Sequence, residues 1–189
     1  MPQIHYSPQE AAAVARVPLS AIQKAITGRA IPARLDRKSG GRRIDETALL
    51  ALALSRSLPA ELTVLPRDAY ALLRQAGADP RDGDLVIGDV VRIDTGRLLA
   101  ETRHRLALLE RARDLIVRDP DILGGTPVIR GTRIPPHALL DRVRDGDTVD
   151  DILAEYPQLD RGTVEAALIH AEANPLRGRP KGKPWLPGS

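Results

Sequence analysis

Residues 119–136 read Asp-Pro-Asp-Ile-Leu-Gly-Gly-Thr-Pro-Val-Ile-Arg-Gly-Thr-Arg-Ile-Pro-Pro and are the most distinctive stretch of this chain. Three glycines and four prolines surround one short apolar run, Val128–Ile129. The backbone is therefore expected to turn, extend briefly and turn again. Although Gly124 and Gly125 are adjacent, no Gly-Lys-Ser/Thr follows them and no helix is expected directly behind them, so the requirement for a phosphate-binding P-loop is not met.

This stretch resembles the opening of the small bacterial domain of unknown function 433, whose members carry Ile-Leu-Gly-Gly-x-Pro-Val-Ile-x-Gly-Thr-Arg-Ile-Pro. The match runs here from Ile122 to Pro135, and the resemblance continues through Gly146, Tyr156-Pro157-x-Leu159 and Ala166-Ala167-Leu168. The family is associated with antitoxins of the VapB kind, which stand beside PIN-like ribonucleases, so the resemblance implies a toxin–antitoxin pair. The signature residues expected to shape the backbone are Gly124, Gly125, Pro127, Gly131, Thr132 and Arg133.

The composition favours a mainly α fold with a small β component. The 189 residues include no Phe, one Trp and three Tyr, so the core must be built from Leu, Ile, Val and Ala, which suits small helical domains. The absence of Cys excludes disulfides and thiolate metal sites. The N-terminal residues lack the features of a signal peptide and no window is apolar enough for a membrane span, so we expect a cytoplasmic protein.

Charge is distributed unevenly along the chain. Between Arg16 and Arg43 eight basic residues face one acid, whereas between Asp141 and Glu172 nine acids face three arginines. The last fifteen residues are basic again. This pattern indicates polyanion binding at one or both ends of the chain, and the alternative is an ordinary solvated surface.

The N-terminal residues predict two consecutive helices. Ser7-Pro8-Gln9-Glu10 is a capping box with proline at the first helical position, so a helix is expected to begin at Pro8. After a break at residues 16–18, a second helix carries Ile22, Ala25 and Ile26 on one face, and Gly28 is expected to end it in the left-handed conformation. Short polar side chains face the other way, as in a helix that reads base edges.

Residues 31–44 predict a two-stranded hairpin with a basic, glycine-containing tip, after which Asp45 caps a third helix. This order resembles the winged helix-turn-helix of MerR-like regulators and phage excisionases, although Pro18 stands where Ser or Thr usually caps the recognition helix. The resemblance implies binding to double-stranded operator DNA. The expected DNA-binding residues are Ser20, Gln23, Lys24, Arg29, Arg34, Arg37, Lys38, Arg42 and Arg43.

Residues 57–113 are expected to connect the two ends of the chain. They contain a short helix over 70–75, strand-like runs over 85–87 and 90–93, and an amphipathic helix over 97–113. That helix could bury Leu99, Leu106 and Leu109 within one chain or against a second copy. A homodimer is expected because two winged helices would suit a palindromic operator.

The resemblance to domain of unknown function 433 and the helix signals predict three short helices, a helix-turn-helix-like bundle over 114–173. The first, 136–145, should place Ala138, Leu139, Leu140 and Val143 in the core; Thr148 and Asp160 should cap the other two. The nine acids argue against direct contact with phosphates and favour a protein-interaction or dimer module. Arg130 and Arg133 could pair with these carboxylates, but the expected role of both is that of a structural clamp.

Residues 174–189 are basic and rich in Pro and Gly, and they are expected to form a flexible tail. Three interpretations stay open: a disordered terminus, a minor-groove hook resembling an AT-hook at Arg177-Gly178-Arg179-Pro180, or an arm that binds the toxin. In the third, which we favour, basic residues enter the carboxylate-lined site of a PIN-like ribonuclease and two apolar residues anchor the arm. The toxin-binding residues would be Arg177, Arg179, Lys181, Trp185 and Leu186.

The sequence predicts no catalytic residues, no metal site and no cofactor. The four histidines, His5, His104, His137 and His170, lie far apart, without ligand spacing. We therefore expect a non-enzymatic antitoxin with a winged helix over 1–56, a connecting segment over 57–113, a domain of unknown function 433 over 114–173 and a tail over 174–189. Two alternatives stay open: a stand-alone transcription or excision factor with an AT-hook-like tail, and a metal-dependent nuclease.

Overall fold

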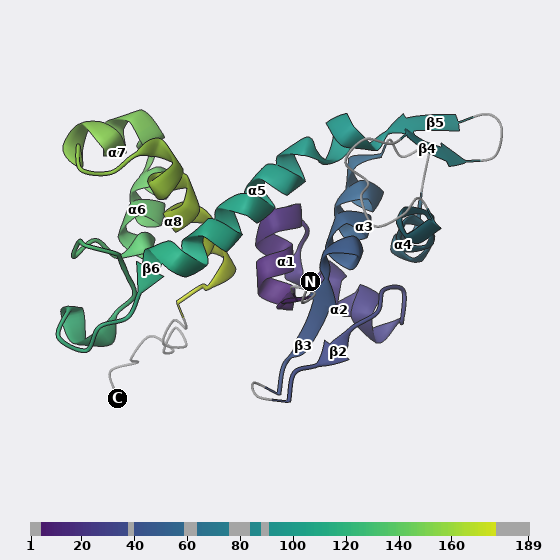
Figure 1. Ribbon diagram of the computed structural model, residues 1–189, viewed down its shortest axis with the longest axis horizontal. Coiled ribbons are helices and arrows are strands. Elements are labelled where there is room, and N and C mark those ends of the chain that lie inside the picture. The colour runs from purple at the N-terminus through teal and green to yellow at the C-terminus, as the bar shows by residue number, and fades with distance from the viewer. Residues whose placement is uncertain (1–4, 38–39, 59–63, 76–83, 88–90, 177–189) are drawn as a thin grey trace, which may run out of the picture.

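A computed structural model describes residues 5–37, 40–58, 64–75, 84–87 and 91–176, and this part of the protein is mainly helical with small antiparallel sheets. The long helix α5 (Thr95–Leu115) runs between an N-terminal body and a C-terminal body (Figure 1). Its 21 residues give it a length of about 31 Å. The mainly α class expected from the composition is confirmed.

The N-terminal body begins with β1 (His5–Tyr6), α1 (Pro8–Ala15) and α2 (Leu19–Thr27). The predicted capping box is present: the Ser7 hydroxyl accepts the N–H of Glu10, and the Glu10 carboxylate accepts the N–H of Ser7 at 2.6 Å. Helix α1 ends at Arg16, whose φ of 52° is left-handed. Helix α2 follows Pro18, which supplies no side-chain cap, as the departure from the winged-helix pattern predicted.

The end of α2 corrects one expectation. Gly28 has a φ of −76°, so it is not the left-handed residue; Arg29, with a φ of 54°, takes that role. The reason is that the N–H of Gly28 still donates to the carbonyl of Lys24 at 2.8 Å, which continues the helical turn by one residue. The reversal then falls on Arg29, and the Ala30 N–H returns to the Ala25 carbonyl at 2.8 Å.

A three-stranded antiparallel sheet follows, in the order β1-β3-β2, with β2 (Arg34–Leu35) and β3 (Arg42–Asp45) forming the predicted hairpin. Asp45 caps α3 (Glu46–Ser57) by accepting the Ala48 N–H at 2.8 Å, also as predicted. The central stretch of α3, from Ala48 to Leu54, is buried on all sides.

The connecting segment contains α4 (Pro66–Gln75) and a second hairpin, β4 (Asp84–Ile87) and β5 (Val91–Asp94). Helix α4 begins earlier than the sequence indicated, at Pro66, because proline suits the first helical position. Leu99, Leu106 and Leu109 of α5 are buried inside the single chain. Of the two alternatives left open for this apolar stripe, the structure therefore shows the intramolecular one.

The C-terminal body contains β6 (Ile116–Val117), the 3-10 turn η2 (Leu123–Gly125), β7 (Val128–Ile129), α6 (Pro136–Asp145), α7 (Val149–Glu155) and α8 (Arg161–Ala173). The signature turns, extends as β7 against β6 and turns again, which confirms the prediction. Gly124, Gly125 and Gly131 all have left-handed φ angles, of 62°, 80° and 74°. Residues with a Cβ are strained there, which explains the glycines.

Two predictions for this body were wrong. Ala138 and Val143 are exposed, because the buried stripe of α6 consists of Pro136, Leu139 and Leu140 and stops before the last turn. Of the two arginines predicted to clamp the structure, Arg130 does so: it donates to the backbone carbonyl of Asp114 at 3.0 and 2.6 Å and closes the end of α5. The same prediction was wrong for Arg133. Arg133 is exposed and has no hydrogen-bond or ion-pair partner among the described residues.

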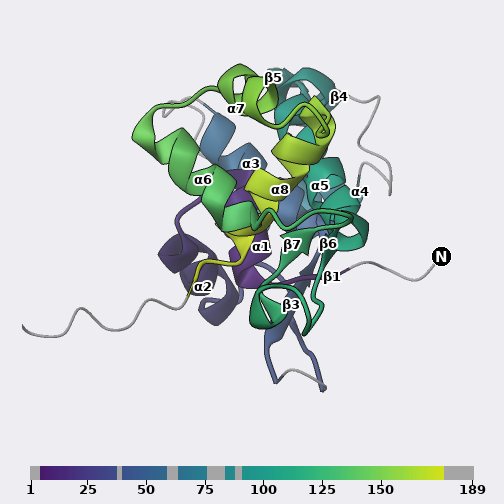
Figure 2. The ribbon, with the colours of Figure 1, turned by 90° about the vertical axis from the view of Figure 1, so that its left-hand side faces the viewer.

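Helix α8 joins the two bodies through opposite faces. Val164 and Ala167 pack into the core of the C-terminal body, whereas Ile169 and Ala173 lie in the core of the N-terminal body, beside α1 and α5. Figure 2 shows α8 lying between α6 on one side and α1 and α5 on the other. Within the described ranges no helix has the length and apolar character of a membrane span.

Candidate nucleic-acid interface

Helix α2 separates apolar and polar side chains cleanly. Ile22, Ala25 and Ile26 are buried, which fixes the rotation of the helix. Ser20, Gln23 and Lys24 are consequently exposed, on the side away from the core. All three were predicted to contact DNA, and their exposure leaves them accessible to a ligand.

The β2–β3 hairpin adds exposed cations next to this face. Arg34, Arg37 and Arg42 are exposed, as is Arg29 in the turn after α2, and Leu35 is 69% exposed although it is apolar. Lys38 lies outside the described residues. In Figure 1 the hairpin projects from the N-terminal body, so its arginines are carried on a protruding element.

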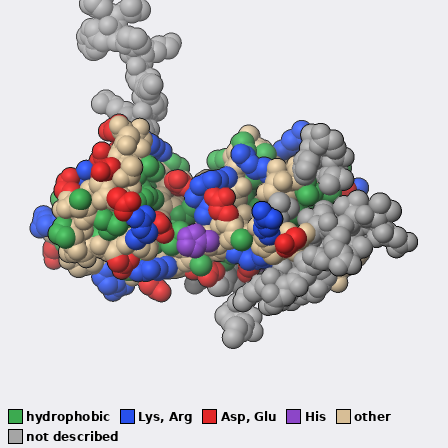
Figure 3. Space-filling model, turned by 90° about the horizontal axis from the view of Figure 1, so that it is seen from above, with side chains coloured by type: hydrophobic (Ala, Val, Ile, Leu, Met, Phe, Trp, Pro, Cys, Tyr) green, Lys and Arg blue, Asp and Glu red, His purple; other side chains and the backbone are tan. Residues whose placement is uncertain are grey.

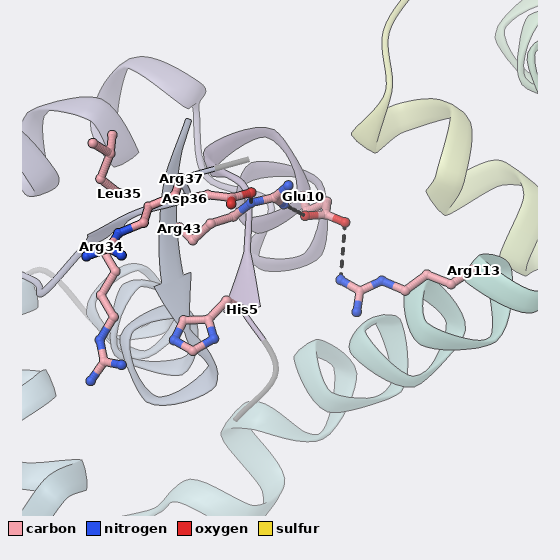
Figure 4. Close-up of a pocket in the computed structure, with 8 residues that line it drawn as sticks. All are labelled: His5, Glu10, Arg34, Leu35, Asp36, Arg37, Arg43 and Arg113. Carbon is pink, nitrogen blue, oxygen red and sulfur yellow. Dashed lines mark hydrogen bonds and ion pairs between the residues drawn. The ribbon is translucent and has the colours of Figure 1, made fainter. Parts of the chain in front are cut away.

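Arg43 differs from the other arginines of the hairpin because it points inward. Its guanidinium pairs with Glu10 at 3.3 Å and with Asp36 at 3.6 Å, and its side chain is only 31% exposed. Figure 4 shows Glu10 between Arg43 of β3 and Arg113 of α5, which lies 3.2 Å from the other Glu10 oxygen. Glu10 therefore caps α1 and also links the hairpin to α5. The sequence predicted the capping role but not the link.

Tyr6 completes this attachment of the hairpin sheet to α5. Its hydroxyl donates to Glu110 at 2.6 Å, and the Arg113 guanidinium lies 5.3 Å from the centre of its ring. Burial, and next the hydrogen bond to Glu110, raise the pKa of Tyr6 well above its ordinary value. The phenol stays neutral and donates this hydrogen bond throughout the physiological pH range.

A hollow of about 530 Å³ opens between the first turn of α1, the polar face of α2 and the hairpin, and we call it the front hollow. Its lining includes Ser7, Gln9, Gln23, Thr27 and Arg42. A second hollow of about 620 Å³ lies behind the hairpin and is lined by four arginines, of which Arg43 and Arg113 are paired with acids (Figure 4). The front hollow thus combines amide and hydroxyl side chains with an exposed guanidinium, a donor set suited to phosphates and base edges.

The sequence did not reveal a third hollow, of about 790 Å³, beside the signature turn. Gly124, Gly125 and Thr126 form one wall, and Arg118, His137 and His170 supply its titratable side chains. The His137 ring is held 2.8 Å from the Asn174 carbonyl, and Arg118 lies 3.4 Å from the Gly125 carbonyl. We call this the signature hollow, and no carboxylate lines it among the described residues.

The pKa of His170 is lowered, first by burial and then by the nearby charges of His137 and Arg118, while Glu10 acts in the opposite direction. The unfolded chain therefore binds a proton more readily than the folded chain below pH 6.5. The stability that this histidine contributes is complete above that pH and is lost as the pH falls through the folded pKa.

We therefore expect His170→Gln to reduce the loss of stability on acidification. Urea unfolding at about pH 7.5 and about pH 5.5 measures it, as the difference in unfolding free energy between the two conditions. The matched control is His104→Gln, whose ring is 65% exposed, and it should keep the wild-type difference. An equal decline in H170Q and wild type would show that this histidine does not carry the effect.

The acids of the C-terminal body are largely matched by arginines. Arg142 pairs with Asp147 and Glu155, and Arg161 with Asp150. Helix α5 adds Arg105, 2.5 Å from Glu172, and Arg111, 3.2 Å from Asp160. Figure 3, which views the molecule from above and so from the side opposite to the hairpin, accordingly shows acidic and basic side chains intermixed.

The remaining predicted site residues divide into two groups. Arg177, Arg179, Lys181, Trp185 and Leu186 all lie outside the described residues. In the signature, Thr132 closes a turn, since its hydroxyl donates to the Ile129 carbonyl at 2.8 Å and accepts the Ile134 N–H at 3.1 Å. Across the described part of the chain, no three His, Asp or Glu side chains are grouped as a metal ion would require.

Comparison with known proteins supports part of this picture. The model of a family described as protein of unknown function (DUF433) matches residues 116–171, which confirms that resemblance. The uncharacterized protein y4eO of Sinorhizobium fredii (strain NBRC 101917 / NGR234) is 34% identical over 180 residues, covering 90% of this chain and 81% of that protein. The crystal structure of Rv2018 from Mycobacterium tuberculosis covers 86% of this chain and 96% of its own, at 18% identity and a TM-score of 0.31, too low to support an argument.

Proposed function

We propose a function for a chain that belongs to the same family as the y4eO protein and carries a DUF433 domain: it is a non-enzymatic, DNA-binding regulator that acts as the antitoxin of a PIN-like ribonuclease. The observation that carries the DNA-binding part is the convergence of the polar face of α2 and the exposed arginines of the β2–β3 hairpin around the front hollow.

In this proposal α1, α2 and the hairpin act as a winged helix-turn-helix. Helix α2 enters the major groove with Ser20, Gln23 and Lys24, and the hairpin places Arg34 and Arg37 on the flanking backbone. The first turn of α1 crosses the phosphates, as the first helix of such motifs does. Support comes from the exposure of these residues and from the inward anchoring of Arg43, which holds the hairpin in a fixed position.

The antitoxin part is supported by the sequence of residues 177–189 and by the place where they begin. Helix α8 ends at Ala173, and Leu176, the last described residue, is 65% exposed, so the described part of the chain ends at the surface. A guanidinium inserted among the acids of a PIN-like ribonuclease would replace the charge of its metal ion and block catalysis. Because α5 buries its apolar stripe inside the chain, the proposed homodimer would have to use another surface.

The test compares the full chain with a version ending at Asn174, each co-expressed with the neighbouring gene. The full chain should capture a nuclease and abolish its activity on RNA, and the shorter chain should not; both should bind upstream DNA with an affinity that falls as salt rises. If both versions bind DNA and neither captures a protein, the chain is a stand-alone regulator. Failure of both to bind DNA at low salt would refute the DNA-binding proposal.

A further inference from the structure

The front hollow and the signature hollow meet at the first turn of α1. Ser7 and Gln9 line both of them. The polar surface is therefore continuous from Gln23 and Arg42, across the start of α1, to Arg118 and His137 of the C-terminal body.

Elements that line the two hollows extend toward the same side of the molecule. In Figures 1 and 2, which share a vertical axis, the loop between β6 and β7 and the β2–β3 hairpin both extend downward from the level of α5. A rod-shaped ligand held against the hairpin and α2 could therefore also lie against this loop.

The chemistry of the signature hollow suits an anion. Arg118 is exposed, and among the described residues it makes a single hydrogen bond, a long one of 3.4 Å to the Gly125 carbonyl, so its other N–H groups have no partner there. The His137 ring donates through Nε2 to the Asn174 carbonyl, so Nδ1 can donate to an anion only while the imidazole is protonated. Asp119 and Asp121 are on the same loop but do not line the hollow, and Glu10 already serves Ser7, Arg43 and Arg113.

The acidic net charge of the C-terminal body, taken alone, argues against anion binding in the signature hollow. Its acids, however, are mostly paired with arginines, and none of these pairs lines the hollow: the arginines are Arg105, Arg111, Arg142, Arg144 and Arg161. The lining of the signature hollow carries Arg118 and two histidines and, among the described residues, no carboxylate.

We propose that the signature hollow binds a backbone phosphate of the same DNA duplex that α2 and the hairpin contact, through Arg118 and His137. This inference rests on the proposed DNA binding and extends it: the DUF433 domain becomes part of the DNA-binding surface, and the Gly-Gly-Thr-Pro turn shapes the wall of a phosphate site. It also extends the contacted length of duplex beyond the winged helix.

The experiment measures binding of the full-length chain to a fluorescent duplex of about 30 base pairs from upstream of its gene, over a series of salt concentrations. Arg118→Gln and His137→Gln are compared with wild type. Arg118→Gln should weaken binding about threefold to tenfold and lower the slope of log affinity against log salt by about one. His137→Gln should weaken binding more at about pH 6 than at about pH 8, because Nδ1 donates to a phosphate only in the protonated ring. The matched control is Arg133→Gln, an exposed signature arginine outside the hollow, which should leave both quantities unchanged.

Thermal melts of each variant separate loss of binding from loss of folding. If Arg118→Gln alters the loop between β6 and β7, His137→Gln tests the same hollow independently. Unchanged affinity and slope in both variants, while hairpin substitutions weaken binding, would overturn this inference and leave the proposed function standing. Equal effects from Arg133→Gln would show a general charge effect and also overturn it. If the wild-type chain binds no duplex, both proposals fail.

Discussion

Replacing Ile169 with alanine is expected to lower the free energy of unfolding of the whole chain by about 2–4 kcal/mol. This side chain belongs to α8 in the C-terminal body, yet it is 2% exposed and packed in the core of the N-terminal body. Removing it opens a cavity between the two bodies, because the close-packed helices α1, α5 and α8 can relax only partly. Urea unfolding, followed by the far-ultraviolet signal of the helices, gives the value.

The same experiment tests whether the two bodies unfold together. Since α8 is shared, we expect one transition in the wild type and a shift of that entire transition in I169A. Val143→Ala is the matched control, because this apolar residue of α6 is 36% exposed and its truncation should change stability by less than about 0.5 kcal/mol. Two separate transitions in the wild type, only one of them moved by I169A, would contradict a common core.

Local signals in the sequence were sufficient to find most of the elements. Capping residues act within one turn, so Ser7, Asp45, Thr148 and Asp160 marked four helix starts that the structure reproduces. The β2–β3 hairpin and the strand at Val128–Ile129 were equally local. The prediction that Gly28 ends α2 in the left-handed conformation was wrong, because glycine permits that conformation without requiring it. Arg29 adopts it instead.

Local sequence signals do not indicate which residues far apart in the chain come into contact. Glu10 reads as a capping residue, and nothing in the sequence indicates that its carboxylate also reaches Arg43 and Arg113. His137 and His170 are 33 positions apart and have no ligand spacing in the sequence, but α6 and α8 bring them into one hollow. The same holds for α8, whose apolar pattern reveals a buried helix but not that its two faces enter two different cores.

Replacing Arg34, Arg37 and Arg42 together with glutamine is expected to weaken binding to duplex DNA about 100-fold at about 150 mM salt. Each of these exposed arginines can neutralise one phosphate and release its counterions, so the slope of log affinity against log salt should fall by about two to three. Fold should be preserved, because Arg43, which anchors the hairpin to Glu10, is left in place. Fluorescence anisotropy over a salt series measures both quantities.

The matched control replaces Arg97, Arg144 and Arg161 with glutamine, an identical change in net charge made on α5, α6 and α8. All three are exposed, and the surface ion pairs of the last two contribute little to stability, so this variant should fold normally. If binding depends on the hairpin, the control loses only the small part of the affinity that follows from overall charge. Equal losses in the two triple variants would mean that net charge, and not the geometry of α2 and the hairpin, attracts the DNA, and the assignment of this surface as the recognition face would be wrong.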